Sequence, residues 1–180
     1  DASGAEKSDP AWEPRPRYWV PDSVVTSSLD ALGWHRSWLM GWRDIANVVN
    51  ERTMIACIFP RGAVGHSEPL FFLDQEAPLW SAFCANMNAL ILDFVARQKV
   101  GGTHVTYGYL KQFPVLPPAF YTAPRLSFIM PRMLELTYTS HRMAPFASDL
   151  GYDGPPFAWA EDRRVHLRAD LDAFFARAYG

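Results

Sequence analysis

The sequence predicts an α+β fold: a small β-sheet with packed helices, followed by a mainly helical C-terminal part. Short apolar runs bounded by charged residues, proline and glycine come early in the chain, and longer segments with helical periodicity come late. The length of 180 residues fits one domain, or one domain with an appended helical piece. We expect a poorly ordered segment at 1–20, an α+β domain at 21–122 and a helical extension at 123–180 packed on that domain.

Short strands are expected in the first half of the chain. Thr53–Phe59 is continuously apolar between an arginine and a proline, which is typical of a buried strand. A glycine-punctuated loop over 61–66 follows, and Leu70–Leu73 is expected to be the next strand. The sequence also suggests short strands at 18–20 and 24–25, on either side of a proline turn.

Helices are expected in the second half. Apolar residues recur at helical spacing from Pro78 to Val95 and predict one helix that ends before Gly101-Gly102. A helix over 125–138 is expected to break or begin at Pro131. Glu161–Ala178 is expected to be a helix with its apolar residues on one side.

Charge is distributed unevenly along the chain. The net charge of −2 and the pI near 6.2 count against a stand-alone, non-specific nucleic-acid binder. Between Phe94 and Leu134, however, the sequence contains no aspartate or glutamate and carries five basic residues: Arg97, Lys99, Lys111, Arg125 and Arg132. We therefore expect this stretch to form a surface that faces an anion.

Several kinds of site find no support in the sequence. The five histidines lie far apart and have no partner at metal-ligand spacing, so no metal site is expected. No Walker loop or nucleophile elbow is present, and no catalytic residue is assigned. Cys57 and Cys84 lie in apolar runs and are expected to be buried, reduced thiols of a cytoplasmic protein. No apolar run approaches the ~20 residues that span a bilayer, so no membrane association is expected.

The best candidate for a binding segment lies at the end of the helix predicted from Pro78. An arginine can bind guanine or phosphate with two hydrogen bonds, a glutamine can pair with adenine, and two glycines let the backbone approach phosphate oxygens. The alternative is that the segment is a helix C-cap with a solvated basic end. The candidate contact residues are Arg97, Gln98, Lys99, Gly101, Gly102, Thr103 and His104, with Arg52 and Arg61 as secondary candidates.

Several short runs share their order and spacing with one family. They are Trp42–Ala46, Asn50–Thr53, Pro60–Arg61, Asp93–His104, Gln112–Pro118, Leu134–Thr139, Gly154–Phe157, Arg168–Ala173 and Tyr179–Gly180. Together they resemble the C-terminal specificity region of the large, single-polypeptide adenine-specific DNA methyltransferases of bacterial restriction–modification and phage-defence systems. The resemblance covers roughly residues 42–180. It implies a target-recognition role at 21–122, double-stranded DNA as partner, and an upstream methyltransferase domain that binds S-adenosylmethionine, with no cofactor in this chain.

One segment approaches the catalytic motif of such enzymes. That motif places Asn, Asp or Ser before Pro-Pro and an aromatic residue, so that a side-chain oxygen and a prolyl carbonyl accept hydrogen bonds from the adenine amino group. In Asp153–Phe157 the residue before the two prolines is Gly154, which has no side-chain acceptor. We interpret this segment as a structural turn.

The sequence thus predicts a non-catalytic DNA target-recognition domain. The alternative is a structural module, in which the basic segment packs on the methyltransferase domain or on a partner defence protein. An independent enzyme is the weakest of the three possibilities, because no set of catalytic residues is recognisable.

Overall fold

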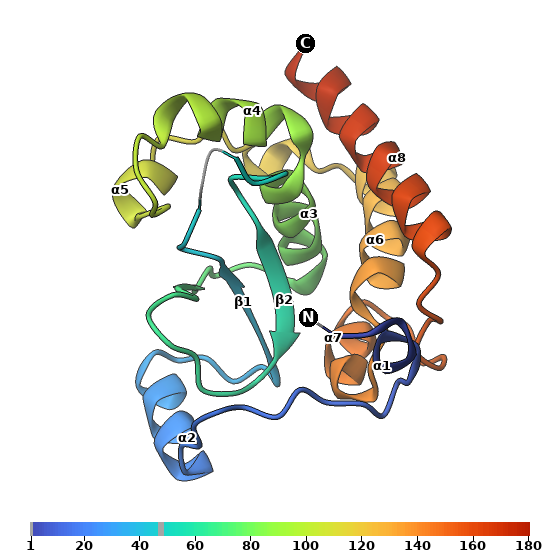
Figure 1. The fold of residues 1–180 in the computed structure, drawn as a ribbon. Helices are drawn as coiled ribbons and strands as arrows, with labels where there is room; N and C mark the ends of the chain where they lie inside the picture. Colours follow the sequence, from blue (N-terminus) through green and yellow to red (C-terminus); the bar gives the residue numbers. More distant parts are fainter. Residues whose placement is uncertain (1, 47–48) are drawn as a thin grey trace.

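The computed structural model describes residues 2–46 and 49–180 and has an α+β architecture (Figure 1). A three-stranded antiparallel sheet has the order β2-β1-β3 and consists of β1 (Trp38–Trp42), β2 (Ala56–Pro60) and β3 (Leu70–Phe71). The helices are α1 (Gly4–Ser8), α2 (Asp22–Ala31), α3 (Ala77–Asn88), α4 (Leu90–Lys99), α5 (Tyr107–Leu110), α6 (Ala123–Thr137), α7 (Ala144–Asp149) and α8 (Glu161–Tyr179). Two 3₁₀ turns, η1 (Pro118–Phe120) and η2 (His141–Met143), flank α6. The predicted fold class is confirmed.

The central strand β1 is buried along its whole length. Trp38 lies in a cluster of edge-to-face rings, with its centroid 5.4 Å from Trp34 and 5.6 Å from Trp80. Gly41 faces the chain that leads into β3, and a Cβ atom there would lie 2.6 Å from the carbonyl oxygen of Pro69. Because no side chain fits in that space, glycine is required at position 41.

The expected strands at 53–59 and 70–73 are present in shortened form as β2 and β3. The strands expected at 18–20 and 24–25 are wrong, because α2 begins at Asp22. Pro21 has an extended backbone before the first turn, and Asp22 places a carboxylate at the positive end of the helix. Val25 then packs on the core, while Val24 stays exposed.

The single helix expected from Pro78 to Val95 is two helices. Ala89 is extended, with φ −65° and ψ 139°, and the axes of α3 and α4 differ by 58°. Asn88 ends α3 with its side-chain amide bonded to Ala56 of β2, and the first amide of α4 donates to Asp172 of α8. Among the described residues no single helix is long and apolar enough to span a membrane. The α3–α4 pair together has the length and apolar composition of a span, but it is bent by 58°.

The C-terminal part is helical, as expected. α6 continues through Pro131, so the break or start expected there is wrong. A proline inside a helix costs about 3 kcal/mol. Here burial of Ile129, Met133 and Leu134 between α3 and α8 offsets that loss. α8 runs beside α6, and its buried face carries Leu167, Leu171 and Phe175 (Figure 1).

Candidate nucleic-acid interface

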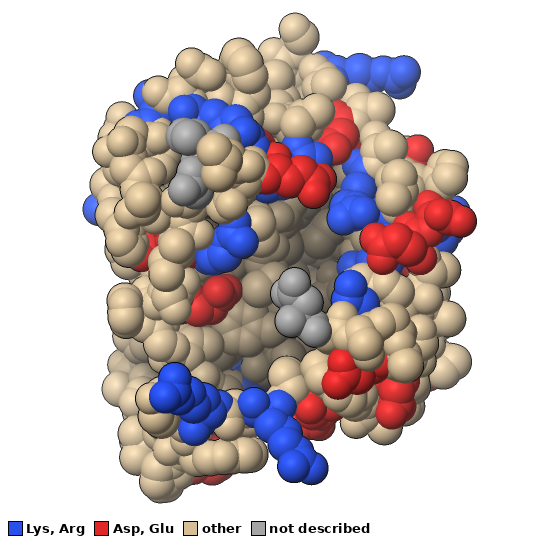
Figure 2. Space-filling model, in the orientation of Figure 1, with Lys and Arg blue, Asp and Glu red and all other residues tan. Residues whose placement is uncertain are grey.

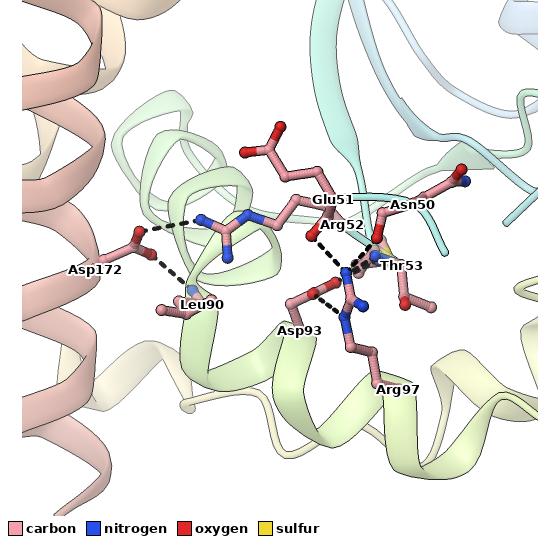
Figure 3. A network of polar contacts seen from close by, with 9 residues as sticks. Asn50, Glu51, Arg52, Thr53, Leu90, Asp93, Arg97 and Asp172 are labelled. Carbon is pink, nitrogen blue, oxygen red and sulfur yellow. Dashed lines mark hydrogen bonds and ion pairs between the residues drawn. The ribbon is translucent and has the colours of Figure 1, made fainter. Parts of the chain in front are cut away.

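Arg97, the first predicted contact residue, bonds inside the protein (Figure 3). Its Nε donates to Oδ2 of Asp93 at 2.9 Å, and its Nη2 donates to the carbonyl oxygens of Asn50, at 2.6 Å, and Glu51. Asp93 is only 1% exposed, and its Oδ1 accepts from the amides of Thr53 and Met54, each at 2.7 Å. Arg97 therefore attaches the segment before β2 to α4.

Arg52 is also held by an internal ion pair (Figure 3). Its Nη2 lies 3.2 Å from Oδ2 of Asp172 on α8, and Oδ1 of the same carboxylate accepts the amide of Leu90 at 2.6 Å. Asp172 therefore joins α8 both to the start of α4 and to the segment before β2.

The rest of the predicted segment is the exposed end of α4 and the loop that follows it. Gln98, Lys99 and the four residues 101–104 are exposed. Val100 and Val105 are buried, with exposed fractions of 3% and 0%. The buried valines fix both ends of the four-residue loop between α4 and α5. Such an exposed loop on a fixed base is the usual place for binding residues.

Asp44 fixes the far end of this loop. Its Oδ2 lies 2.6 Å from Nδ1 of His104, and its carbonyl oxygen accepts the amide of Val105 at 2.7 Å. The amide of Asp44 donates to the carbonyl of Ser67 at 2.9 Å, so the end of the 61–67 loop also reaches this point. The two predicted loops therefore meet at Asp44. Arg61 directly follows the last residue of β2, and its Nη2 donates to Oγ1 of Thr26 in α2.

Residues 94–134 contain no aspartate or glutamate, but carboxylates from other parts of the chain lie beside their arginines. Arg132 is 3.0 Å from Asp170 of α8, and Arg97 is paired with Asp93. Arg125 lies 3.9 Å from the ring centroid of Phe120 and also donates to the Phe120 carbonyl. The expectation of one positively charged face is therefore wrong, because residues outside the stretch supply carboxylates to two of its arginines.

A cleft between β2 and α3 on one side and α6 and α8 on the other was not predicted. It has a volume of about 850 Å³, and blue surface borders the hollow on the face shown in Figure 2. The charged residues that line it, among those described, are Arg43, Arg52, Arg164, Arg168, Glu51 and Asp172. The spacing of Arg164 and Arg168, four residues apart on α8, is the signal in the sequence that could have indicated one cationic helix face.

The thiols differ in their surroundings. Both cysteines are free; Cys84 is buried as expected, but Cys57 is exposed, so its expected burial is wrong. Cys57 lines the cleft, and its Sγ lies 3.5 Å from Oε1 of Glu68. Desolvation by the surrounding protein, with Glu68, raises the pKa of the Cys57 thiol, so it stays protonated at neutral pH.

The segment Asp153–Phe157 is an irregular stretch with a bend at Gly154, and its contacts are structural. The rings of Tyr152 and Phe157 stack with centroids 5.2 Å apart, and the Phe157 amide donates to the carbonyl of Tyr138 at 2.8 Å. A Cβ atom at Gly154 would overlap the Tyr152 ring. Packing against Tyr152 therefore explains the glycine before the two prolines.

Comparison of the chain with protein-family models, with curated proteins and with solved structures found no match. Among residues 2–46 and 49–180, no group of three or more His, Cys, Asp or Glu side chains is arranged to hold a metal ion.

Proposed function

We propose that this chain is a DNA target-recognition module of an adenine-specific, S-adenosylmethionine-dependent DNA methyltransferase of a restriction–modification or phage-defence system. The observation that carries the proposal is the segment from Gln98 to His104, which exposes two polar side chains at the end of α4 and then four residues, two of them glycines, between the buried Val100 and Val105. The ordered resemblance of residues 42–180 to the specificity regions of such enzymes supports the same role.

The recognition loop, defined as residues 98–104, offers two kinds of contact. Lys99 and the amides of Gly101 and Gly102 suit phosphate oxygens, and Gln98 suits an adenine edge. In the proposed enzyme, the module holds the duplex while the methyltransferase domain of the same polypeptide, which would bind S-adenosylmethionine, takes the adenine out of the stack. The chain contributes orientation and no chemical step.

The test is duplex binding by this chain across a series of salt concentrations. Gln98→Ala combined with Lys99→Ala should weaken binding and lower the salt slope by about one, because one phosphate contact is lost. Arg177→Ala, which removes an exposed cation of α8, is the matched control and should change neither quantity. An unchanged slope in the double variant would remove the assignment. Arg97→Ala is unsuitable for this test, because Arg97 holds the fold.

A docking module is the second candidate, and the outer face of α4 favours it. Leu90 and Phe94 lie one turn apart there and are 54% and 60% exposed. Such a pair is suited to contact with another protein surface. Leu90→Ser with Phe94→Ser should then abolish association with the methyltransferase domain and leave duplex binding by this chain unchanged. Loss of duplex binding in this variant would instead support the DNA-binding role of the region.

A further inference from the structure

The cleft between β2 and α8 gathers guanidinium groups from three separate parts of the chain. Arg43 follows β1, Arg52 precedes β2, and Arg164 and Arg168 lie on α8. Together with Glu51 and Asp172, the described lining has a formal excess of two positive charges in a chain whose net charge is −2. The cleft is therefore positively charged, whereas the protein as a whole is negatively charged.

The two guanidinium groups on α8 differ in how firmly they are held. Arg164 donates to the carbonyl of Leu136 at 2.9 Å and lies 3.7 Å from the centroid of the Trp159 ring. Arg168 is 55% exposed, and its ion pair among the described residues is a long one, 3.7 Å, with Glu161. Arg164 is thus fixed at the cleft wall, while Arg168 keeps donors for a ligand.

The carboxylates of the cleft do not neutralise this pair. Asp172 is already bonded to Arg52 and to the Leu90 amide. Burial lowers the pKa of Arg164, and the like charge of Arg168, four residues along the same helix, lowers it further, while Glu161 and Glu135 act in the opposite direction. An anion placed between Arg164 and Arg168 would relieve the repulsion of these like charges and share their donors.

We propose that this cleft binds the phosphate group of a nucleotide or of a nucleic-acid strand, with Arg164 and Arg168 as the principal donors and Arg43 and Arg52 on the facing wall. Arginine presents a planar fork of donors that matches phosphate oxygens. The volume of about 850 Å³ falls in the range of small-molecule pockets. The inference goes beyond the proposed function, since no residue of the recognition loop lines the cleft.

The test is calorimetric titration of the full chain with four probes: inorganic phosphate, adenosine triphosphate, adenosine and a five-nucleotide single strand. Arg168→Glu should weaken binding of the phosphate-bearing probes at least about tenfold, because it replaces an attractive charge by a repulsive one. Arg177→Glu makes the same charge change on the exposed surface of α8, outside the cleft, and should leave affinity within about twofold. Arg168→Gln, which removes charge without adding repulsion, should give an intermediate loss.

The probes separate the two sources of phosphate. Tighter binding of the triphosphate identifies a nucleotide site, and tighter binding of the strand identifies a strand site; both support the proposal. Equal binding of adenosine and adenosine triphosphate, equal effects of Arg168→Glu and Arg177→Glu, or no binding of any probe at low salt would overturn it. The recognition loop is tested on duplex DNA with Gln98→Ala combined with Lys99→Ala, and the cleft is tested on these probes with Arg168→Glu against Arg177→Glu, so failure of the loop and failure of the cleft give different results.

Discussion

Arg97 and Lys99 are two residues apart in sequence and have different surroundings. Lys99 is exposed, whereas Arg97 neutralises a carboxylate, that of Asp93, which is 1% exposed. Breaking a buried ion pair by removing one partner leaves an uncompensated charge, which destabilises a protein more than losing a surface cation does. Composition alone cannot separate these two roles.

Replacement of Arg97 by alanine should therefore lower the free energy of unfolding by about 3 kcal/mol, because the buried carboxylate of Asp93 loses its counter-charge. Urea denaturation at neutral pH measures the change. Lys99→Ala is the matched control and should stay within about 0.5 kcal/mol of the unchanged chain. Equal stabilities of the two variants would show that Arg97 does not hold the segment before β2.

Two glutamates should shift stability in opposite directions with pH. Burial raises the pKa of Glu68 above its ordinary value of 4.5, and the hydrogen bond from Arg163 lowers the pKa of Glu135 below it. Ionised Glu68 therefore disfavours the folded state, and this penalty grows as the pH rises through 4.5 and above. The stability contributed by Glu135 is present above 4.5 and is lost as the pH falls through its lowered pKa.

Glu68→Gln should accordingly stabilise the chain at pH 7, and Glu135→Gln should destabilise it at the same pH. Both differences should shrink as the solution is acidified, first for Glu68, whose pKa is raised, and at lower pH for Glu135, whose pKa is lowered. Unfolding by urea at several pH values gives the two curves. The same sign for both variants at pH 7 would contradict the assignment of either environment.

At the scale of elements, the junction of α3 and α4 shows what local patterns omit. The apolar stripe from Pro78 to Val95 is continuous in sequence, so periodicity predicts one helix. The break at Ala89 depends on Asn88 bonding to β2 and on Asp172 capping α4, and both contacts join residues far apart in the chain. The element types were predictable there; the turn between them was not.

Asn88 is expected to stabilise the outer edge of the sheet. Its Oδ1 accepts the amide of Ala56 at 3.1 Å, and its Nδ2 donates to the Ala56 carbonyl at 2.8 Å. Asn88→Ala should lower the free energy of unfolding by about 2 kcal/mol, because two backbone groups of a buried residue lose their partners. Gln112→Ala removes an exposed amide and should change little. A neutral Asn88→Ala variant would show that water replaces these bonds without loss.

β1 and α2 show two further limits of the sequence. β1 is buried on both faces, so the alternation that marks a half-exposed strand is missing. The valines at 24 and 25 favour a strand by propensity, but Pro21 and Asp22 start a helix. α8 was expected from its own residues and is present, because its length and the recurrence of its apolar residues suffice there.

At the scale of the whole molecule, the candidate sites depend on contacts that no linear pattern contains. The proposed recognition loop could be selected from local composition, since its exposed residues lie within seven positions of the sequence. The cleft was missed because its arginines come from positions 43, 52, 164 and 168 and meet only when α8 folds back onto α4 and α6. The same folding brings Asp170 to Arg132 and removes the expected basic face.

α8 should be required for cooperative folding of the chain. Leu167, Leu171 and Phe175 are each at most 5% exposed, and burial of such a side chain contributes about 1.5–3 kcal/mol. Their sum is comparable with the ~5–15 kcal/mol by which a domain is stable. A chain ending at residue 160 should lose near-ultraviolet dichroism and a sharp thermal transition, whereas the full chain should unfold in one transition by fluorescence and dichroism. A sharp transition in the shortened chain would contradict this.

Asn88 also limits the sheet to its three strands on the β2 side. A bare edge strand can pair with the same strand of a second molecule and start ordered aggregation. The side-chain amide of Asn88 occupies the outward amide and carbonyl of Ala56, so an incoming strand finds them already engaged. We therefore expect Asn88 to disfavour pairing with a second molecule at this point of β2, and crowded solutions of Asn88→Ala should scatter more light than those of the unchanged chain.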